Sequence, residues 1–116
     1  MEMTIDAYLD FLKLNQQASA TAVELARELW GLLSAVHPGL MQPDAAPGPD
    51  GMVMLAWDDG RHHLEFEVMT KGAIEALFHD RETGESIDLG YYCGLNKIDV
   101  KTVIPEKIEL FVKKTA

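Results

Sequence analysis

The feature that most constrains the fold of this chain is a run of three alternating apolar segments separated by glycine turns. Residues 49–85 read PDGMVMLAWDDGRHHLEFEVMTKGAIEALFHDRETGE. Alternation of apolar and polar residues is typical of a strand with one buried face, and Asp-Gly supplies the positive backbone angles that a tight hairpin turn requires. The pattern predicts an antiparallel β-meander over residues 52–93, with three strands and a shorter fourth one.

Each predicted strand presents one apolar face and one mixed face. The apolar face is expected to be buried, and it consists of Val53, Leu55, Trp57, Leu64, Phe66, Val68, Ile74 and Phe78. The second face is more apolar than an exposed sheet face should be, so either the C-terminal segment or a partner should cover it. The residues that we expect to bind such a partner are Met52, Met54, Ala56, His63, Leu77 and His79.

The first third of the chain has helical periodicity, with an apolar stripe through residues 3–14. Thr21 and Glu24 match a capping box, which predicts that a helix begins near Thr21. Pro38 and the glycine after it should end that helix. The pattern leaves open whether residues 3–36 form one bent helix or two, and we expect this helical part to pack on the apolar face of the meander.

Two further segments complete a single α+β domain over residues 1–116. Residues 38–51 hold four of the five prolines and are predicted to be a surface linker. The C-terminal segment, residues 96–114, is ambiguous. Its apolar spacing fits a helix with Pro105 in the first turn, whereas Ile108, Leu110 and Val112 alternate as in a strand. We favour the helix.

The composition excludes several classes of protein. The formal net charge is −9, from 19 acidic and 10 basic residues, which disfavours binding to nucleic acid. There is no apolar run of about 18 residues, the length that a membrane span needs. The N-terminus is acidic, so we expect no signal peptide. A single cysteine, Cys93, allows no internal disulfide, and we expect a cytoplasmic protein.

No recognisable catalytic constellation is present, so binding is expected rather than catalysis, and no cofactor is expected. Cys93 lacks an identifiable activating base and is predicted to be an unreactive thiol. The neighbours His62 and His63 should point to opposite faces of a strand. A metal or small-molecule site would instead need His63 and Glu65 on one strand and His79 on the next, provided that the register brings them together.

The order of segments resembles a group of small bacterial proteins of no assigned activity. The resemblance covers residues 21–80 and rests on PDGMVMLAW, LEFEV and GAIEALFHD after a helix and a proline-rich linker. The N-W-D-G-x-G-A segment of that group is replaced by LNQQASA. The resemblance implies a helix-plus-meander fold. We therefore expect a non-enzymatic protein-binding or accessory protein that uses a sheet face or edge and could form a homodimer. The alternative is a small-molecule or metal-dependent activity at the face formed by His63, Glu65 and His79.

Overall fold

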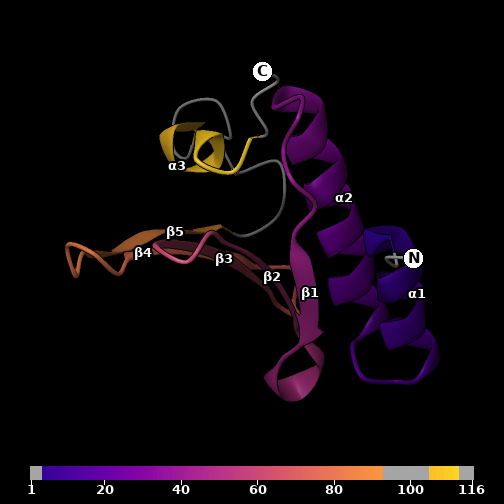
Figure 1. Cartoon of the computed structure of the whole chain (residues 1–116). Coiled ribbons are helices and arrows are strands. Elements are labelled where there is room, and N and C mark those ends of the chain that lie inside the picture. The colour runs from indigo at the N-terminus through magenta and orange to yellow at the C-terminus, as the bar shows by residue number, and fades with distance from the viewer. Residues whose placement is uncertain (1–3, 93–104, 113–116) are drawn as a thin grey trace.

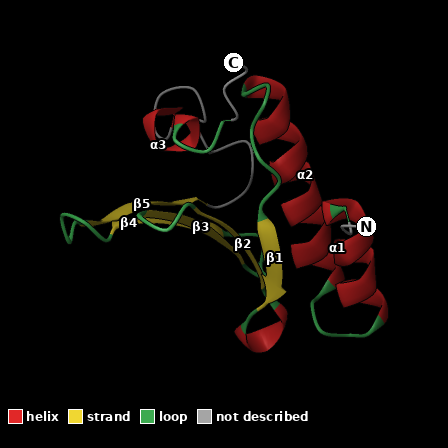
Figure 2. Ribbon diagram, in the orientation of Figure 1, coloured by secondary structure: helices red, strands yellow, loops and turns green. Residues whose placement is uncertain are grey.

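The computed structural model describes residues 4–92 and 105–112. It confirms an α+β fold, with a five-stranded antiparallel sheet instead of the three or four strands expected (Figures 1 and 2). The strands lie side by side in chain order. The elements are α1 (Ile5–Leu14), α2 (Ala20–Val36), β1 (Asp44–Pro47), the 3-10 turn η1 (Pro49–Gly51), β2 (Val53–Asp58), β3 (His62–Val68), β4 (Ile74–Asp80), β5 (Ser86–Tyr92) and α3 (Pro105–Glu109).

The N-terminal part forms two separate helices. The Thr4 hydroxyl caps α1 by accepting the Ala7 amide at 3.1 Å. A helix begins near Thr21, as predicted, but the predicted capping box at Thr21 and Glu24 is wrong, because α2 begins at Ala20 and its N-cap is Ser19. The Ser19 hydroxyl accepts the Ala22 amide at 3.0 Å, and its own backbone amide donates to the Gly51 carbonyl at 2.8 Å. A contact with η1, which local sequence does not reveal, therefore fixes where α2 begins.

The predicted linker, residues 38–51, contains β1, the strand that the sequence pattern did not predict. Pairing of β1 with β2 runs from Asp44 opposite Ala56 to Pro47 opposite Val53. Proline cannot donate to a strand ladder, and it is tolerated because β1 lies at the edge of the sheet. Helix α1 contacts β1, so this edge of the sheet is flanked by a helix.

The hydrophobic core lies between the sheet and α2. The eight sheet residues predicted to be buried are all buried, and the facing side of α2 contributes Ala22, Val23, Ala26, Leu29 and Leu33. Trp57 lies at the centre, with its ring centroid 5.9 Å from that of Phe66 and 6.4 Å from that of Trp30. Its indole N–H donates to the Met41 carbonyl at 2.6 Å, which satisfies the one polar group of a buried ring.

The C-terminal segment packs on this same core face. Phe111 is buried with its ring centroid 6.5 Å from that of Trp57, and the Lys107 ammonium lies 4.4 Å from the centroid of Phe78. The predicted helix is present over Pro105–Glu109, after which Val112 forms an isolated β-bridge with Leu40. Residues 96–104 and 113–114 of this segment lie outside the described residues. Within the described residues, no helix has the length and apolar content needed to cross a bilayer.

Candidate functional site

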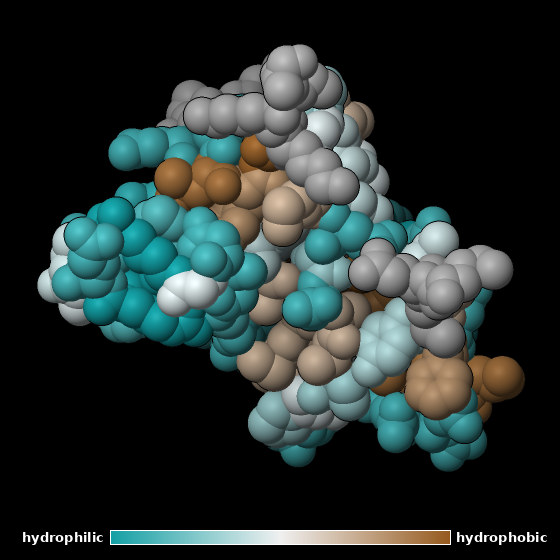
Figure 3. Space-filling view, viewed as in Figure 1, coloured by the Kyte–Doolittle hydropathy of each residue, from teal (hydrophilic) through white to brown (hydrophobic). Residues whose placement is uncertain are grey.

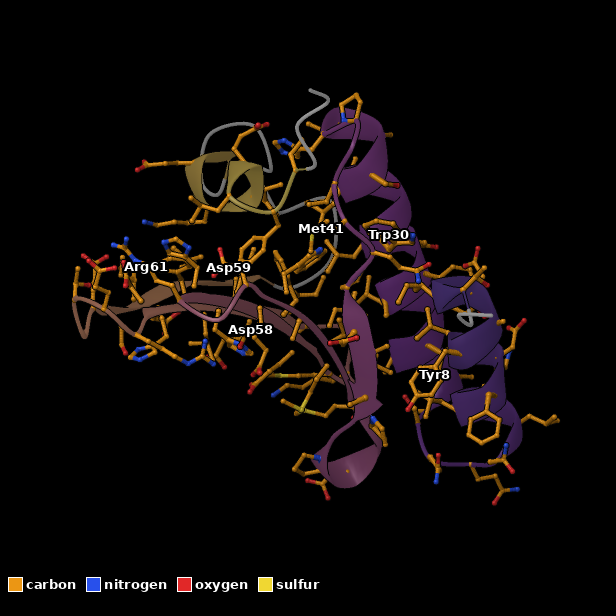
Figure 4. All side chains as sticks on the ribbon, viewed as in Figure 1. Tyr8, Trp30, Met41, Asp58, Asp59 and Arg61 are labelled. Carbon is orange, nitrogen blue, oxygen red and sulfur yellow. The ribbon has the colours of Figure 1, made fainter. Side chains whose placement is uncertain are left out.

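The sheet face opposite the core, which we call the open face, is the candidate site. Helices α2 and α3 lie on the core side of the sheet, and none of the described α-helices lies on the other side (Figure 1). Figure 4 shows Asp58 on the open side, away from Trp30 and Met41. The pairing registers place on the open face Asp44, Ala46, Met54, Ala56, Asp58, His63, Glu65, Glu67, Glu75, Leu77, His79, Ser86 and Asp88.

Five of the six residues expected to bind a partner share this face. They are Met54, Ala56, His63, Leu77 and His79. Met52 precedes β2 and lies with Met54 against Gly48, where a β-carbon would come within 2.5 Å of the Met52 Cγ. A larger residue at Gly48 would therefore displace the side chain of Met52, which lies next to the open face and not on it.

The apolar residues of the open face do not form one continuous patch. In one row across the sheet, Ala56, Glu65, Leu77 and Asp88 follow each other on β2 to β5. In a parallel row, Met54 is followed by Glu67 and Glu75. Carboxylates of β3 therefore separate the methionine region from Leu77, and the face alternates between apolar and acidic.

A groove of about 340 Å³ lies on the open face over β3, β4 and β5. Leu77 has Glu65 directly opposite on β3 and Asp88 directly opposite on β5. The side chains that line the groove from this face are His63, Glu65, Leu77, His79, Ser86 and Asp88. The groove thus combines one apolar side chain with two flanking carboxylates.

The two histidines of the groove are held by local hydrogen bonds. His63 lies directly opposite His79, as a shared site would require. However, the His63 Nδ1 is 2.9 Å from Asp58 and its Nε2 is 3.3 Å from Glu65, so both ring nitrogens are already engaged. The His79 Nδ1 is 2.6 Å from the Ser86 hydroxyl. In the part of the chain that the structure describes, no group of three or more His, Cys, Asp or Glu side chains is placed to hold a metal ion.

His62 lies on the opposite face from His63, as strand geometry predicts. It pairs with Asp80 across β3 and β4 and stacks on Phe78, with the ring centroids 6.0 Å apart. Its Nδ1 lies 2.8 Å from the Asp59 carboxylate. This histidine therefore belongs to the rim of the core and not to the groove.

The open face is strongly acidic. None of its described strand positions is lysine or arginine. Six of its positions carry a carboxylate: Asp44, Asp58, Glu65, Glu67, Glu75 and Asp88. Burial, together with the charge and hydrogen bond of Glu65 and the charge of Glu75, raises the pKa of Glu67. Like charges in this part of the sheet are thus close enough to oppose one another.

The arginines next to the open face form ion pairs at the end of the sheet where the β2–β3 and β4–β5 turns lie. This end, which we call the free end of the sheet, is hydrophilic in Figure 3. Arg81 makes two bonds to Asp58, at 3.0 and 2.6 Å, and Arg61 makes two bonds to Asp80, both at 3.1 Å. These guanidinium groups hold the pKa values of Asp58 and Asp80 well below their usual range. The sequence analysis missed this network, although a meander necessarily brings the β2–β3 and β4–β5 turns to one end of the sheet.

No protein-family model, curated protein or solved structure matches the chain. The resemblance to a group of small bacterial proteins therefore stays a prediction. The predicted unreactive thiol, Cys93, lies outside the described residues and is not tested either.

Proposed function

We propose that the protein is a non-enzymatic binding or accessory protein whose open face docks a protein partner. The observation that supports this function is the pair of apolar side chains, Met54 and Leu77, on a sheet face over which none of the described α-helices packs. Apolar surface left in water costs about 25 cal/mol per Å². A partner that covers these side chains would remove them from water, as the helices do for the apolar side chains of the core face.

The face is better suited to docking than either edge of the sheet. The β1 edge lies against α1 and contains Pro47. Strand β5 has a register irregularity opposite Ala76 and Leu77 and carries Asp88, and bulges and charges are features that discourage strand addition.

The preferred occupant is a different protein and not a second copy of this chain. A two-fold symmetric contact would bring the same patch of both copies together. Carboxylates of the open face would then meet carboxylates, and each copy would add a net charge of −9. The homodimer is therefore the alternative outcome. A cytoplasmic location, where a lone cysteine stays reduced, is part of the proposal.

The test is quantitative binding of a partner that co-purifies from the native host and is then purified by itself. Met54→Glu and Leu77→Asp should each weaken this complex at least about tenfold, equivalent to about 1.4 kcal/mol. Circular dichroism should show that both variants stay folded, because both side chains lie outside the core.

Leu14→Glu is the matched control, because Leu14 is 83% exposed on α1. It makes the same change from apolar to acidic on a different surface. If this variant weakens the complex and the two open-face variants do not, the binding surface is α1 and the proposal is wrong. Light scattering that shows a dimer which Met54→Glu dissociates would replace the partner by a second copy.

A further inference from the structure

We infer that the groove around Leu77 accepts an arginine or lysine side chain, so that the partner docks through a basic segment. This inference rests on the proposed function and adds the chemistry of the partner to it. The occupant is defined by charge complementarity to the open face. Arg81 of the β4–β5 turn pairs with Asp58, but none of the described strand positions of the face is a lysine or arginine that could neutralise the other carboxylates.

The geometry of the groove matches the two parts of a long basic side chain. Arginine and lysine have an apolar stem and a charged head, and they commonly bury the stem. Leu77 offers an apolar surface for the stem, and Glu65 and Asp88 flank it on the neighbouring strands. Since adjacent strands are about 4.8 Å apart, the two carboxylate-bearing positions are about 10 Å apart, one on each side of the leucine. A guanidinium or ammonium group above Leu77 can therefore bond to either carboxylate.

The acidic side chains continue along the sheet beyond the groove. Glu67 follows Glu65 on the same face of β3 and lies directly opposite Glu75. Positions two apart on a strand are separated by about 7 Å. A partner segment that carries basic side chains at alternate positions would therefore meet Glu65 first and then the pair of Glu67 and Glu75. Burial, and after it the charges of Glu65 and Glu75, raise the pKa of Glu67, and a cation would relieve the part that comes from those charges.

Other occupants fit the groove less well. A phosphate or an acidic peptide would be repelled by the six carboxylates of the face. A second copy of this chain would present those same carboxylates, and its arginines at the free end of the sheet are bonded to Asp58 and Asp80. A metal ion would have to displace the hydrogen bonds of His63 and lie beside Leu77. A basic side chain uses the groove as it stands.

The first experiment uses two short synthetic peptides that alternate leucine with arginine or with citrulline. Citrulline has almost the same shape as arginine but carries no charge. The arginine peptide should shift the amide resonances of β3, β4 and β5 in the isotope-labelled full chain, and its affinity should fall as salt is added. The citrulline peptide should bind at least about tenfold more weakly. A lysine peptide decides whether the planar guanidinium is preferred over a point charge.

Paired variants separate the groove from the general attraction between a basic peptide and an acidic protein. Glu65→Gln with Asp88→Asn should weaken binding of the arginine peptide about tenfold. The control is Glu28→Gln with Glu106→Gln, which removes the same charge from two exposed helical positions. An equal loss in both pairs would mean that the peptide responds only to net charge, and the inference would be overturned.

The native partner distinguishes failure of this inference from failure of the proposed function. If Leu77→Asp weakens the native complex but Glu65→Gln with Asp88→Asn does not, the open face is the docking surface and the basic segment is wrong. If Leu77→Asp leaves the native complex unchanged, the proposed function itself is wrong. Loss of binding in both variants, with the Glu28 and Glu106 control unaffected, supports both.

Discussion

Among individual residues, Leu29 is the simplest test of the core. Its side chain is fully buried on the face of α2 that packs against the sheet. Leu29→Ala should lower the free energy of unfolding by about 2–5 kcal/mol, because it removes transfer free energy and leaves a cavity. Urea denaturation would measure this change. Leu14→Ala makes the same truncation at a position that is 83% exposed and should change stability by less than about 0.5 kcal/mol.

The Glu67 carboxylate on the open face lowers the stability of the folded protein at neutral pH. Its pKa is raised in the folded state, first by burial and then by Glu65 and Glu75. The folded chain therefore holds this proton more readily than the unfolded chain does, so this group lowers stability as the pH rises above the unfolded value of about 4.3. Glu67→Gln should raise the melting temperature at pH 7 and change it little at pH 3.

Glu28→Gln is the control for Glu67, because Glu28 is exposed on α2. Equal melting temperatures for Glu67→Gln and wild type at pH 7 would show that the carboxylates of the open face do not oppose folding. A basic ligand bound to the face should have the same effect as the substitution, because it relieves the same repulsion.

At the scale of elements, the two turns at the free end of the sheet are joined by reciprocal ion pairs. Arg61 of the β2–β3 turn bonds to Asp80 at the end of β4, and Arg81 of the β4–β5 turn bonds to Asp58 at the end of β2. The partners are 19 and 23 residues apart in the chain. Bidentate geometry of this kind fixes orientation as well as charge, so the pairs set how the two hairpins align.

These ion pairs predict a definite dependence of stability on pH. The pKa values of Asp58 and Asp80 are lowered in the folded state. Their contribution to stability is therefore present above the unfolded value of about 3.9 and is lost as the pH falls through the folded values. Asp58→Asn should lower the melting temperature at pH 7 and make the decline toward acid shallower. Melting curves between pH 7 and pH 2 would measure both effects.

The exposed Asp50 of η1 provides the matched substitution, Asp50→Asn, which should leave the acid decline unchanged. A wild-type protein whose stability does not fall toward acid pH would contradict the assignment of these pairs. So would an Asp58→Asn variant with the same decline as the wild type.

The elements also show how far the sequence determines the fold. Strands β2, β3 and β4 could be predicted because each alternates between apolar and polar residues. Strand β1 could not, because DAAP between prolines has no such pattern and becomes a strand only by pairing with β2. Asp88 was missed as a site residue because its place opposite Leu77 depends on a register irregularity between β4 and β5. Long-range pairing decided both cases.

At the scale of the whole molecule, the described α-helices leave one sheet face open. The helical layer covers the core face (Figure 1), and the charged turns lie at the free end of the sheet (Figure 3). A separate exposed apolar surface is formed on α1 by Phe11 and Leu14. The sequence predicted that the C-terminal segment or a partner would cover the open face. The described part of that segment, including Phe111, packs on the core face instead.

The charge of the open face predicts that this chain is monomeric by itself. A symmetric dimer through the face would place Glu65, Glu67 and Glu75 of both copies in one interface, where like charges opposite one another are destabilising. Removing those charges should relieve the opposition while Met54 and Leu77 remain. We therefore expect sedimentation equilibrium to show a monomer at low and high protein concentration, and association only for the triple variant Glu65→Gln, Glu67→Gln, Glu75→Gln. A wild-type dimer that persists in low salt would contradict this, because the repulsion is then strongest.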